Sequence, residues 1–350
     1  MGMERLLREA VAKGASDLHI TVGLPPVLRL AGSLIPTADP VLTASDTDEL
    51  LAAVTTEEQR CKFYRQGELD FAYSLQGISR FRINSFRQRG FTALAVRVIK
   101  EIIPPLEQLS HSEAVQVLAR KQRGLVLVTG PTGSGKSTTL AAMIDLINRE
   151  RNCHIITLED PIEYWHSHKR SIVNQREINT DTQSFGKALR AALREDPDVI
   201  LVGEMRDSQT IGIAITAAET GHLVLATLHT GDAVQTIDRI INAFPPYQQQ
   251  QIRMQLSFTL QGIVAQQLLP CCTGGQVAAM EIVMATPAIR NLIREGKSQQ
   301  IMSVIQTSAK AGMKSMDRSL QELYQQGIIS YEAALSRAVD QESFIRLLNG

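Results

Sequence analysis

Residues Gly130–Ser137 read Gly-Pro-Thr-Gly-Ser-Gly-Lys-Ser and fit the pattern G-x-x-x-x-G-K-[S/T] of a phosphate-binding loop. The apolar run Leu125–Thr129 precedes this loop, and an amphipathic helical pattern begins at Ser137. A loop of this kind needs a buried strand that ends at the phosphates and a helix that begins beside them. A chance glycine turn, the alternative interpretation, does not need either element. The sequence therefore predicts an α/β fold with a nucleotide site at the carboxyl edge of a parallel sheet.

Each part of the predicted loop has its own role in binding a nucleotide. The glycines let successive backbone N–H groups surround phosphate oxygens, and the helix N-terminus adds a partial positive charge. Lys136 is expected to reach the β- and γ-phosphates, and Ser137 to be a ligand of Mg²⁺. The residues expected to bind the nucleotide in this segment are Gly130, Pro131, Thr132, Gly133, Ser134, Gly135, Lys136, Ser137 and Thr138.

Acidic side chains follow two further apolar runs. Glu204 comes directly after the predicted strand Val199–Val202, and Glu159, Asp160 and Glu163 follow the strand His154–Leu158. Since parallel strands end at one edge of the sheet, these acids are expected to face the same phosphates. Glu204 is the candidate for orienting the attacking water or for acting through Mg²⁺. The alternatives are a solvated acid after a strand and an acidic surface turn shaped by Pro161.

Two histidines flank the apolar run Leu223–Thr227. Either His222 or His229 has a donor that suits a γ-phosphate or a neighbouring chain. A histidine taken alone is more often a hydrogen-bonded structural residue, so that interpretation stays open for both.

The chain is predicted to have two domains. Residues 1–100 combine helical patterns with alternating strands and predict a small α+β domain. Residues 101–111 contain Pro104-Pro105 and are expected to form the interdomain linker. Residues 112–350 show a βαβ rhythm that predicts a parallel sheet covered on both faces, and from about residue 247 nearly everything is expected to be helical.

Arginines crowd the later strands of the first domain and alternate with Phe81 and Phe86. Such a pattern occurs on nucleic-acid platforms, but also on a solvated sheet face. A third use is phosphoryl transfer, in which an arginine from the same or a neighbouring subunit neutralises charge on the γ-phosphate. The arginines concerned are Arg80, Arg82, Arg87, Arg89 and Arg97.

Composition narrows the function classes. The 350 residues carry 36 Lys and Arg against 36 Asp and Glu, so the formal net charge is zero and argues against nucleic acid as a partner. The longest apolar runs are far shorter than the roughly 18 residues that cross a bilayer. The N-terminus lacks the pattern of a secretory signal, and the 4 cysteines have neither disulfide nor zinc spacing. These observations predict a cytoplasmic protein.

Four segments in order resemble the secretion-ATPase superfamily that powers type II secretion and type IV pili. They are GPTGSGKST, TLEDPIEY, ILVGEMRD and GHLVLATLHT, which are similar to its Walker A, Asp box, atypical Walker B and His box. Residues Ser16–Ile20 and Pro25-Pro26 extend the similarity into the first domain. Ala288–Glu295 reads AIRNLIRE and resembles the signature of the motors that retract pili, the PilT family.

The resemblance implies a ring-shaped homohexamer with a PAS-like N-terminal domain and a RecA-like ATPase domain that uses ATP and Mg²⁺. It implies that Arg82 and Arg97 reach the γ-phosphate when the linker closes, beside the catalytic candidates Glu204, Glu163 and His229. Glu159, Asp160 and His222 are implied to bind the nucleotide, and Glu204 to act on Mg²⁺, through water or directly. Closing and reopening would convert hydrolysis into domain rotation.

The implied partner is a platform protein of the inner membrane, so the chain is expected at the cytoplasmic face and on the membrane only through that partner. Extension motors and type II secretion ATPases are the main alternative, although they usually carry an extra N-terminal domain and a four-cysteine zinc insertion. A RecA-like nucleic-acid translocase and a nucleotide-gated assembly protein are further alternatives. Ala288–Glu295 is also compatible with a plain amphipathic helix that packs the C-terminal region.

Overall fold

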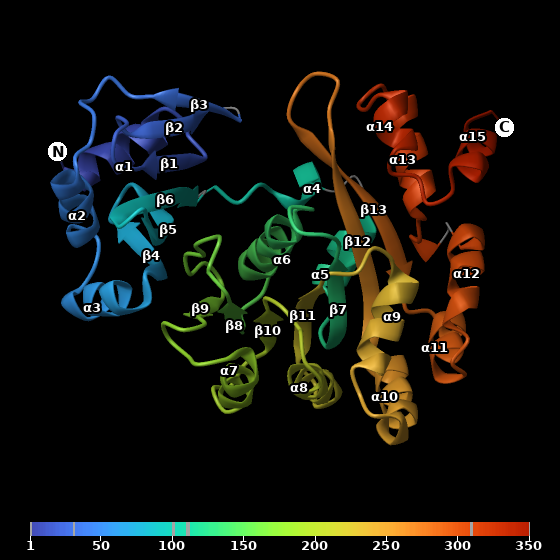
Figure 1. Ribbon diagram of the computed structural model, residues 1–350. Helices are drawn as coiled ribbons and strands as arrows, with labels where there is room; N and C mark the ends of the chain where they lie inside the picture. Colours follow the sequence, from blue (N-terminus) through green and yellow to red (C-terminus); the bar gives the residue numbers. More distant parts are fainter. Residues whose placement is uncertain (1, 31, 100–101, 110–112, 309–310, 350) are drawn as a thin grey trace. The chain divides into compact units, whose positions relative to one another are not determined.

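The computed structural model describes residues 2–30, 32–99, 102–109, 113–308 and 311–349. The chain divides into two compact units, Met1–Ile102 and Ile103–Gly350. Figure 1 labels the helices and strands of both units. No helix in the described ranges combines the length and the apolar character that crossing a bilayer requires.

The N-terminal unit is a six-stranded antiparallel sheet with helices, as the α+β prediction required. The strand order is β3-β2-β1-β6-β5-β4. Side chains on β5 alternate, so Phe81 and Ile83 are buried in the core while Arg82 between them faces the other side. Its elements are α1 (Met3–Ala12), β1 (Asp17–Ile20), β2 (Val27–Leu30), β3 (Ser33–Pro36), α2 (Ala44–Ala52), α3 (Glu57–Gln66), β4 (Glu68–Leu75), β5 (Ser79–Gln88) and β6 (Phe91–Ile99).

The second unit is built on a seven-stranded sheet in the order β13-β12-β7-β11-β10-β8-β9. All neighbouring pairs from β12 to β9 are parallel, and β13 is antiparallel to β12. The predicted parallel sheet is thus confirmed. Its strands are β7 (Gly124–Thr129), β8 (His154–Glu159), β9 (Ile172–Glu177), β10 (Val199–Val202), β11 (Leu223–Leu228), β12 (Leu260–Pro270) and β13 (Gln276–Met284).

Helices cover both faces of this sheet. On β7, Leu125 and Leu127 point into one core while Val126 and Val128 point into the other. Helices α4, α5 and α6 supply the second core, and α7 to α12 supply the first. The helices are α4 (Leu106–Leu109), α5 (Glu113–Ala119), α6 (Lys136–Glu150), α7 (Phe185–Ala192), α8 (Ser208–Glu219), α9 (Ala233–Asn242), α10 (Pro246–Thr259), α11 (Pro287–Arg294), α12 (Ile301–Thr307), α13 (Met316–Gln325), α14 (Tyr331–Leu335) and α15 (Gln341–Asn349).

The expectation of a helical region from about residue 247 is wrong in one large part. After α10 the chain forms the long hairpin β12–β13, which extends the central sheet (Figure 1). The glutamines and leucines of β12 favour a helix when taken alone, but pairing with β7 on one side and β13 on the other overrides that preference. Gly274 and Gly275 have positive φ and form the hairpin turn.

The segment expected as the linker contains a short helix as well as residues without regular structure. Residues 102–105 have no regular structure, and α4 begins at Leu106, whose side chain is fully buried in the core of the second unit. The chain therefore joins the second unit before the predicted end of the linker. Residues 101, 110 and 111 of that prediction lie outside the described residues.

Candidate nucleotide-binding site

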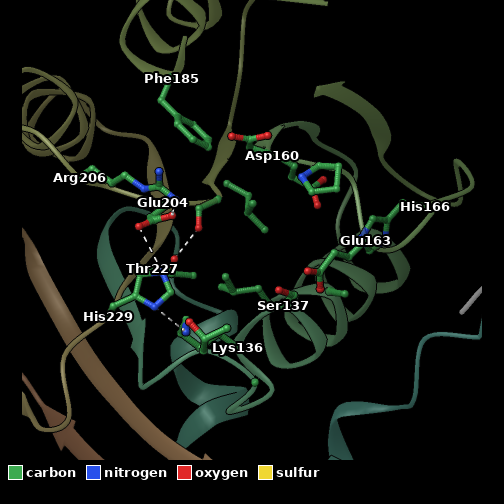
Figure 2. Close-up of a pocket in the computed structure, with 18 residues that line it drawn as sticks. Lys136, Ser137, Asp160, Glu163, His166, Phe185, Glu204, Arg206, Thr227 and His229 are labelled. Carbon is green, nitrogen blue, oxygen red and sulfur yellow. Dashed lines mark hydrogen bonds and ion pairs between the residues drawn. The ribbon is translucent and has the colours of Figure 1, made fainter. Parts of the chain in front are cut away.

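A cavity of about 300 Å³ opens where the parallel strands of the second unit end. The phosphate-binding loop, the Asp box after β8, the Walker B segment after β10 and the end of β11 all contribute to its lining (Figure 2). The cavity thus forms at the edge where the sequence places the nucleotide. Its lining includes Thr132, Gly133, Lys136, Ser137, Glu159, Asp160, Glu163, Glu204 and His229.

The phosphate-binding loop has the backbone that its glycines were expected to allow. Gly133 and Gly135 lie in the left-handed region, with φ of 78° and 86°. A Cβ atom at Gly130 would stand 2.3 Å from the carbonyl oxygen of Gln266, so only glycine fits there. Helix α6 begins at Lys136 without a side-chain cap, which leaves its first N–H groups available to an anion.

The Lys136 side chain is held within its own loop. Its Nζ donates hydrogen bonds to the carbonyl oxygens of Gly130 at 2.8 Å and Pro131 at 2.9 Å, and lies 3.4 Å from His229 Nδ1. Burial lowers the pKa of Lys136, while the negative charges of Glu204 and Glu163 act in the opposite direction. The ammonium group therefore sits beside both acids proposed for catalysis.

Glu204 lies between two cationic or donor side chains. Arg206 Nη2 lies 2.7 Å from one carboxylate oxygen, and His229 Nε2 lies 3.2 Å from the other (Figure 2). Partial burial raises the pKa of Glu204, but the hydrogen bonds and charges of Arg206 and His229 outweigh it, so the pKa falls below its ordinary value. Glu204 therefore favours its ionised form beside the phosphate-binding loop.

The acids at and after the end of β8 divide into two environments. The hydroxyl of Thr157 and the amide of Gln175 donate to Oε1 of Glu159, at 2.6 and 3.1 Å. Burial raises the pKa of Glu159 to about 7 in spite of these bonds. Asp160 and Glu163 also line the cavity. Glu159 therefore has both hydrogen-bond donors and an environment that favours its protonated form.

His222 does not lie at this cavity. It precedes the first residue of β11, whereas His229 follows the last one, so the two imidazoles stand at opposite ends of the strand. His222 Nδ1 lies 2.9 Å from the carbonyl oxygen of Ala217 and 3.2 Å from the Thr220 hydroxyl. Its expected contact with the nucleotide of this cavity is corrected here, because a strand of six residues separates it from the carboxyl edge.

Thr138 and four residues of the loop are not among the residues that line the cavity. The Thr138 hydroxyl lies 2.8 Å from the Tyr164 hydroxyl and so links α6 to the Asp box. Gly130, Pro131, Ser134 and Gly135 shape the loop and are not among the residues that line the cavity. Their predicted nucleotide contacts through backbone N–H groups remain predictions.

Several residues of the site were not predicted from the sequence. Arg206, Thr227, Phe185 and His166 line the cavity, and Gln266 braces the loop from β12. Arg206 and Thr227 had a signal, because both lie at or just after the carboxyl end of a predicted strand. Gln266 had none, since the surrounding sequence was interpreted as helix.

Arg82 and Arg97 lie in the N-terminal unit as direct partners on β5 and β6, so they share one face of that sheet. Arg82 Nη2 is 2.6 Å from Asp70 Oδ2, and Arg97 Nε is 3.2 Å from Asp17 Oδ1. The Arg82 side chain is 41% exposed and the Arg97 side chain 68%, which fits the solvated-face interpretation and equally an arginine that serves a bound phosphate.

A family model described as "Type II/IV secretion system protein" matches residues 2–336. The chain belongs to this family. It is 47% identical over 344 residues to the Pseudomonas aeruginosa protein described as "Type IV pilus retractation ATPase PilT", a match that covers 98% of this chain and all of the relative. It is 49% identical over 340 residues to a "Twitching motility protein" of Neisseria gonorrhoeae, covering 97% of this chain and 91% of the relative.

A solved structure gives the same assignment. The crystal structure described as the "Pilus Retraction Motor PilT and Bound ADP" superposes with a TM-score of 0.93, at 50% identity and with 99% of both chains covered. The resemblance to the PilT family of type II/IV secretion proteins is thereby confirmed.

The motif Ala288–Glu295 of this secretion-family chain lies on α11. Ile289 and Ile293 are fully buried, so the helix packs the core as an amphipathic helix does. Arg290 donates from Nη1 to the carbonyl oxygens of Ser257 and Phe258, both at 2.7 Å, near the C-terminal end of α10. The motif thus ties α11 to the end of α10 and is more than a packing face.

The residues around the cavity fit a nucleotide with Mg²⁺. Mg²⁺ in phosphate-binding-loop proteins takes few protein oxygens and completes its shell with phosphate and water oxygens. Ser137 and Glu204 supply such oxygens at the cavity.

Proposed function

We propose that the chain is a motor ATPase that acts as a homohexamer to retract type IV pilus fibres and so drives twitching motility. The carrying observation is the convergence of Lys136, Glu204 and His229 on one cavity of a P-loop fold, in a chain matched from end to end by relatives whose names describe this task. The substrate is ATP, and its hydrolysis requires Mg²⁺.

The proposed chemistry assigns one task to each side chain. Lys136 leaves the carbonyl groups of its own loop and binds the β- and γ-phosphates, and Ser137 and Glu204 are the residues that would hold Mg²⁺. Bound Mg²⁺ neutralises phosphate charge. Glu204 orients the attacking water and takes up its proton, which its ionised state permits. His229 and Glu163 take part in catalysis beside the γ-phosphate, and Asp160, which also lines the cavity, binds the nucleotide.

The N-terminal unit completes the proposed site. Arg82 and Arg97 neutralise charge on the γ-phosphate when the two units close on ATP, and reopening after hydrolysis gives the mechanical step. Force passes to a platform protein in the inner membrane, which holds the motor at the cytoplasmic face. The membrane contact is made through that partner, and nucleic acid is not a partner.

The test counts surface pili and retraction events in the native host. A deletion strain should keep abundant pili that do not retract, and a Glu204→Gln copy should fail to restore retraction while the wild-type copy succeeds. A deletion strain without pili would instead assign the chain to extension or secretion. ATPase activity of the purified wild-type chain that rises strongly with DNA would favour a nucleic-acid translocase.

A further inference from the structure

Arg206 is a charged residue of the site for which the proposed chemistry has no task. It lies two residues after Glu204, beyond the end of β10, and lines the cavity together with Asp160 (Figure 2). Its side chain is 72% exposed, yet its Nη2 stands 2.7 Å from Glu204 Oε2, whose own side chain is only 18% exposed. A long, exposed side chain thus reaches back from solvent to a largely covered carboxylate.

The two oxygens of Glu204 are engaged by different partners. Oε2 pairs with Arg206, and Oε1 lies 3.2 Å from His229 Nε2. Because each oxygen is bound from a different segment, the plane of the carboxylate is fixed in rotation as well as in position. A carboxylate held by one partner alone would keep that rotation free.

His229 extends this arrangement to the phosphate-binding loop. Its Nδ1 lies 3.4 Å from Lys136 Nζ, and an ammonium group has hydrogens to donate and no lone pair to accept. In the neutral imidazole Nδ1 therefore accepts and Nε2 carries the proton that is donated to Glu204. Contacts between charged and donor groups therefore run continuously along the cavity lining, from Arg206 through Glu204 and His229 to Lys136.

Stability does not explain why Arg206 takes this position. An exposed ion pair contributes little to folding, since solvent screens it and a flexible side chain must be ordered. The effect of the contact falls instead on Glu204, whose orientation decides where an attacking water can stand.

We propose that Arg206 is a positioning residue for ATP hydrolysis: it holds Oε2 of Glu204 so that the carboxylate keeps a fixed orientation toward His229 and the phosphates. This inference rests on the proposed function, because it assigns a residue to the same reaction. Arg206 acts through Glu204 and makes no phosphate contact of its own. A role as a direct phosphate ligand is the competing outcome that the experiment must separate.

The test compares purified full-length variants under saturating Mg²⁺ for turnover, KM for ATP, and affinity for ATP and for ADP. Arg206→Met should lower kcat by about 10- to 100-fold, while KM and both affinities change by less than about 3-fold. Arg206→Lys, which keeps a donor and the charge, should recover a large part of the loss. Arg120→Met is the matched control. Arg120 is also an exposed arginine paired with a glutamate, since it lies 2.9 Å from Glu150, but it does not line the cavity. Its replacement should leave turnover unchanged.

A second background shows whether Arg206 acts through Glu204. In a Glu204→Gln chain, adding Arg206→Met should cause no further loss of the residual rate, because the carboxylate that Arg206 positions is already gone. Additive losses would overturn the inference, as would unchanged kcat in Arg206→Met. A selective loss of ATP affinity over ADP affinity would make Arg206 a phosphate ligand instead. If the wild-type chain itself hydrolyses no ATP, the proposed function fails and not this inference alone.

Discussion

Gln266 on β12 donates a buried hydrogen bond of 2.6 Å to the carbonyl oxygen of Ser134 in the phosphate-binding loop, across 132 residues of sequence. The same glutamine has its backbone carbonyl close to Gly130 and its amide close to Gly135. The hairpin β12–β13 therefore supports the loop from behind, at a point where the loop backbone has unusual φ angles.

Replacing Gln266 by alanine removes this support and leaves a buried carbonyl group without its donor. We expect a loss of about 1–3 kcal/mol in unfolding free energy and nucleotide affinity weaker by roughly 5- to 20-fold. Fluorescent-nucleotide titration and denaturant unfolding measure the two effects. Gln267→Ala, which changes the next, partly exposed glutamine, is the control. Equal affinities in Gln266→Ala and the wild-type chain would show that the loop holds its shape without β12.

Substitutions at Lys136 and Glu204 should have different effects on nucleotide binding and on turnover. Lys136→Ala removes the cation that reaches the phosphates and is expected to lower nucleotide affinity by at least about 10-fold. Glu204→Gln keeps the size of the side chain but cannot take up a proton, so binding should persist while kcat falls by about 100-fold or more. Isothermal titration and a phosphate-release assay measure the two quantities. Near-normal turnover in Glu204→Gln would remove Glu204 from the catalytic role.

Local patterns predicted the centre of the fold and of the site. Strand, loop and helix follow one another within Leu125–Glu150, so the phosphate-binding loop could be recognised without distant residues. The acids at the ends of β8 and β10 line one cavity because the carboxyl ends of parallel strands share one edge, and their roles there stay predictions.

Features that depend on distant pairing could not be predicted in this way. Strands β12 and β13 become strands through their hydrogen bonds to β7 and to each other, and their own composition favours helix. Gln266 therefore had no visible link to the loop that it supports. His222 was grouped with His229 because they flank one strand, although strand length alone places them at opposite edges of the sheet.

Arg82 and Arg97 test whether the N-terminal unit takes part in hydrolysis. If their charges compensate the γ-phosphate in the transition state, Arg82→Ala and Arg97→Ala should each lower kcat by about 10- to 1,000-fold. Affinity for ADP should change little, since ADP lacks the γ-phosphate. Arg65→Ala, an exposed arginine on α3 of the same unit, is the control. Wild-type rates in both variants would support the solvated-face interpretation.

Glu281 on β13 is a carboxyl group buried in the second unit, with 1% of its area exposed. Its Oε1 accepts a hydrogen bond of 2.8 Å from the backbone N–H of Ala233, where α9 begins, and its Oε2 has no hydrogen-bond partner within the described part of the chain. Burial raises the pKa of Glu281 from 4.5 to about 7 against that hydrogen bond, and the charges of Asp232 and Asp317 add to the increase.

A raised carboxyl pKa makes the folded state bind a proton more tightly than the unfolded state, so stability should fall as pH rises from about 4.5 through 7. The size of the effect is on the order of 3 kcal/mol between pH 4.5 and pH 8. Glu281→Gln has no proton to lose, so the free energy of unfolding of the wild type should fall relative to that of the variant over this range.

The single tryptophan, Trp165, lies in the second unit and reports its unfolding in urea at fixed protein concentration. Glu113→Gln, at an exposed position of the same unit, should follow the wild type. A difference in stability between the wild type and Glu281→Gln that stayed constant from pH 4.5 to pH 8 would show that burial does not raise the pKa of Glu281.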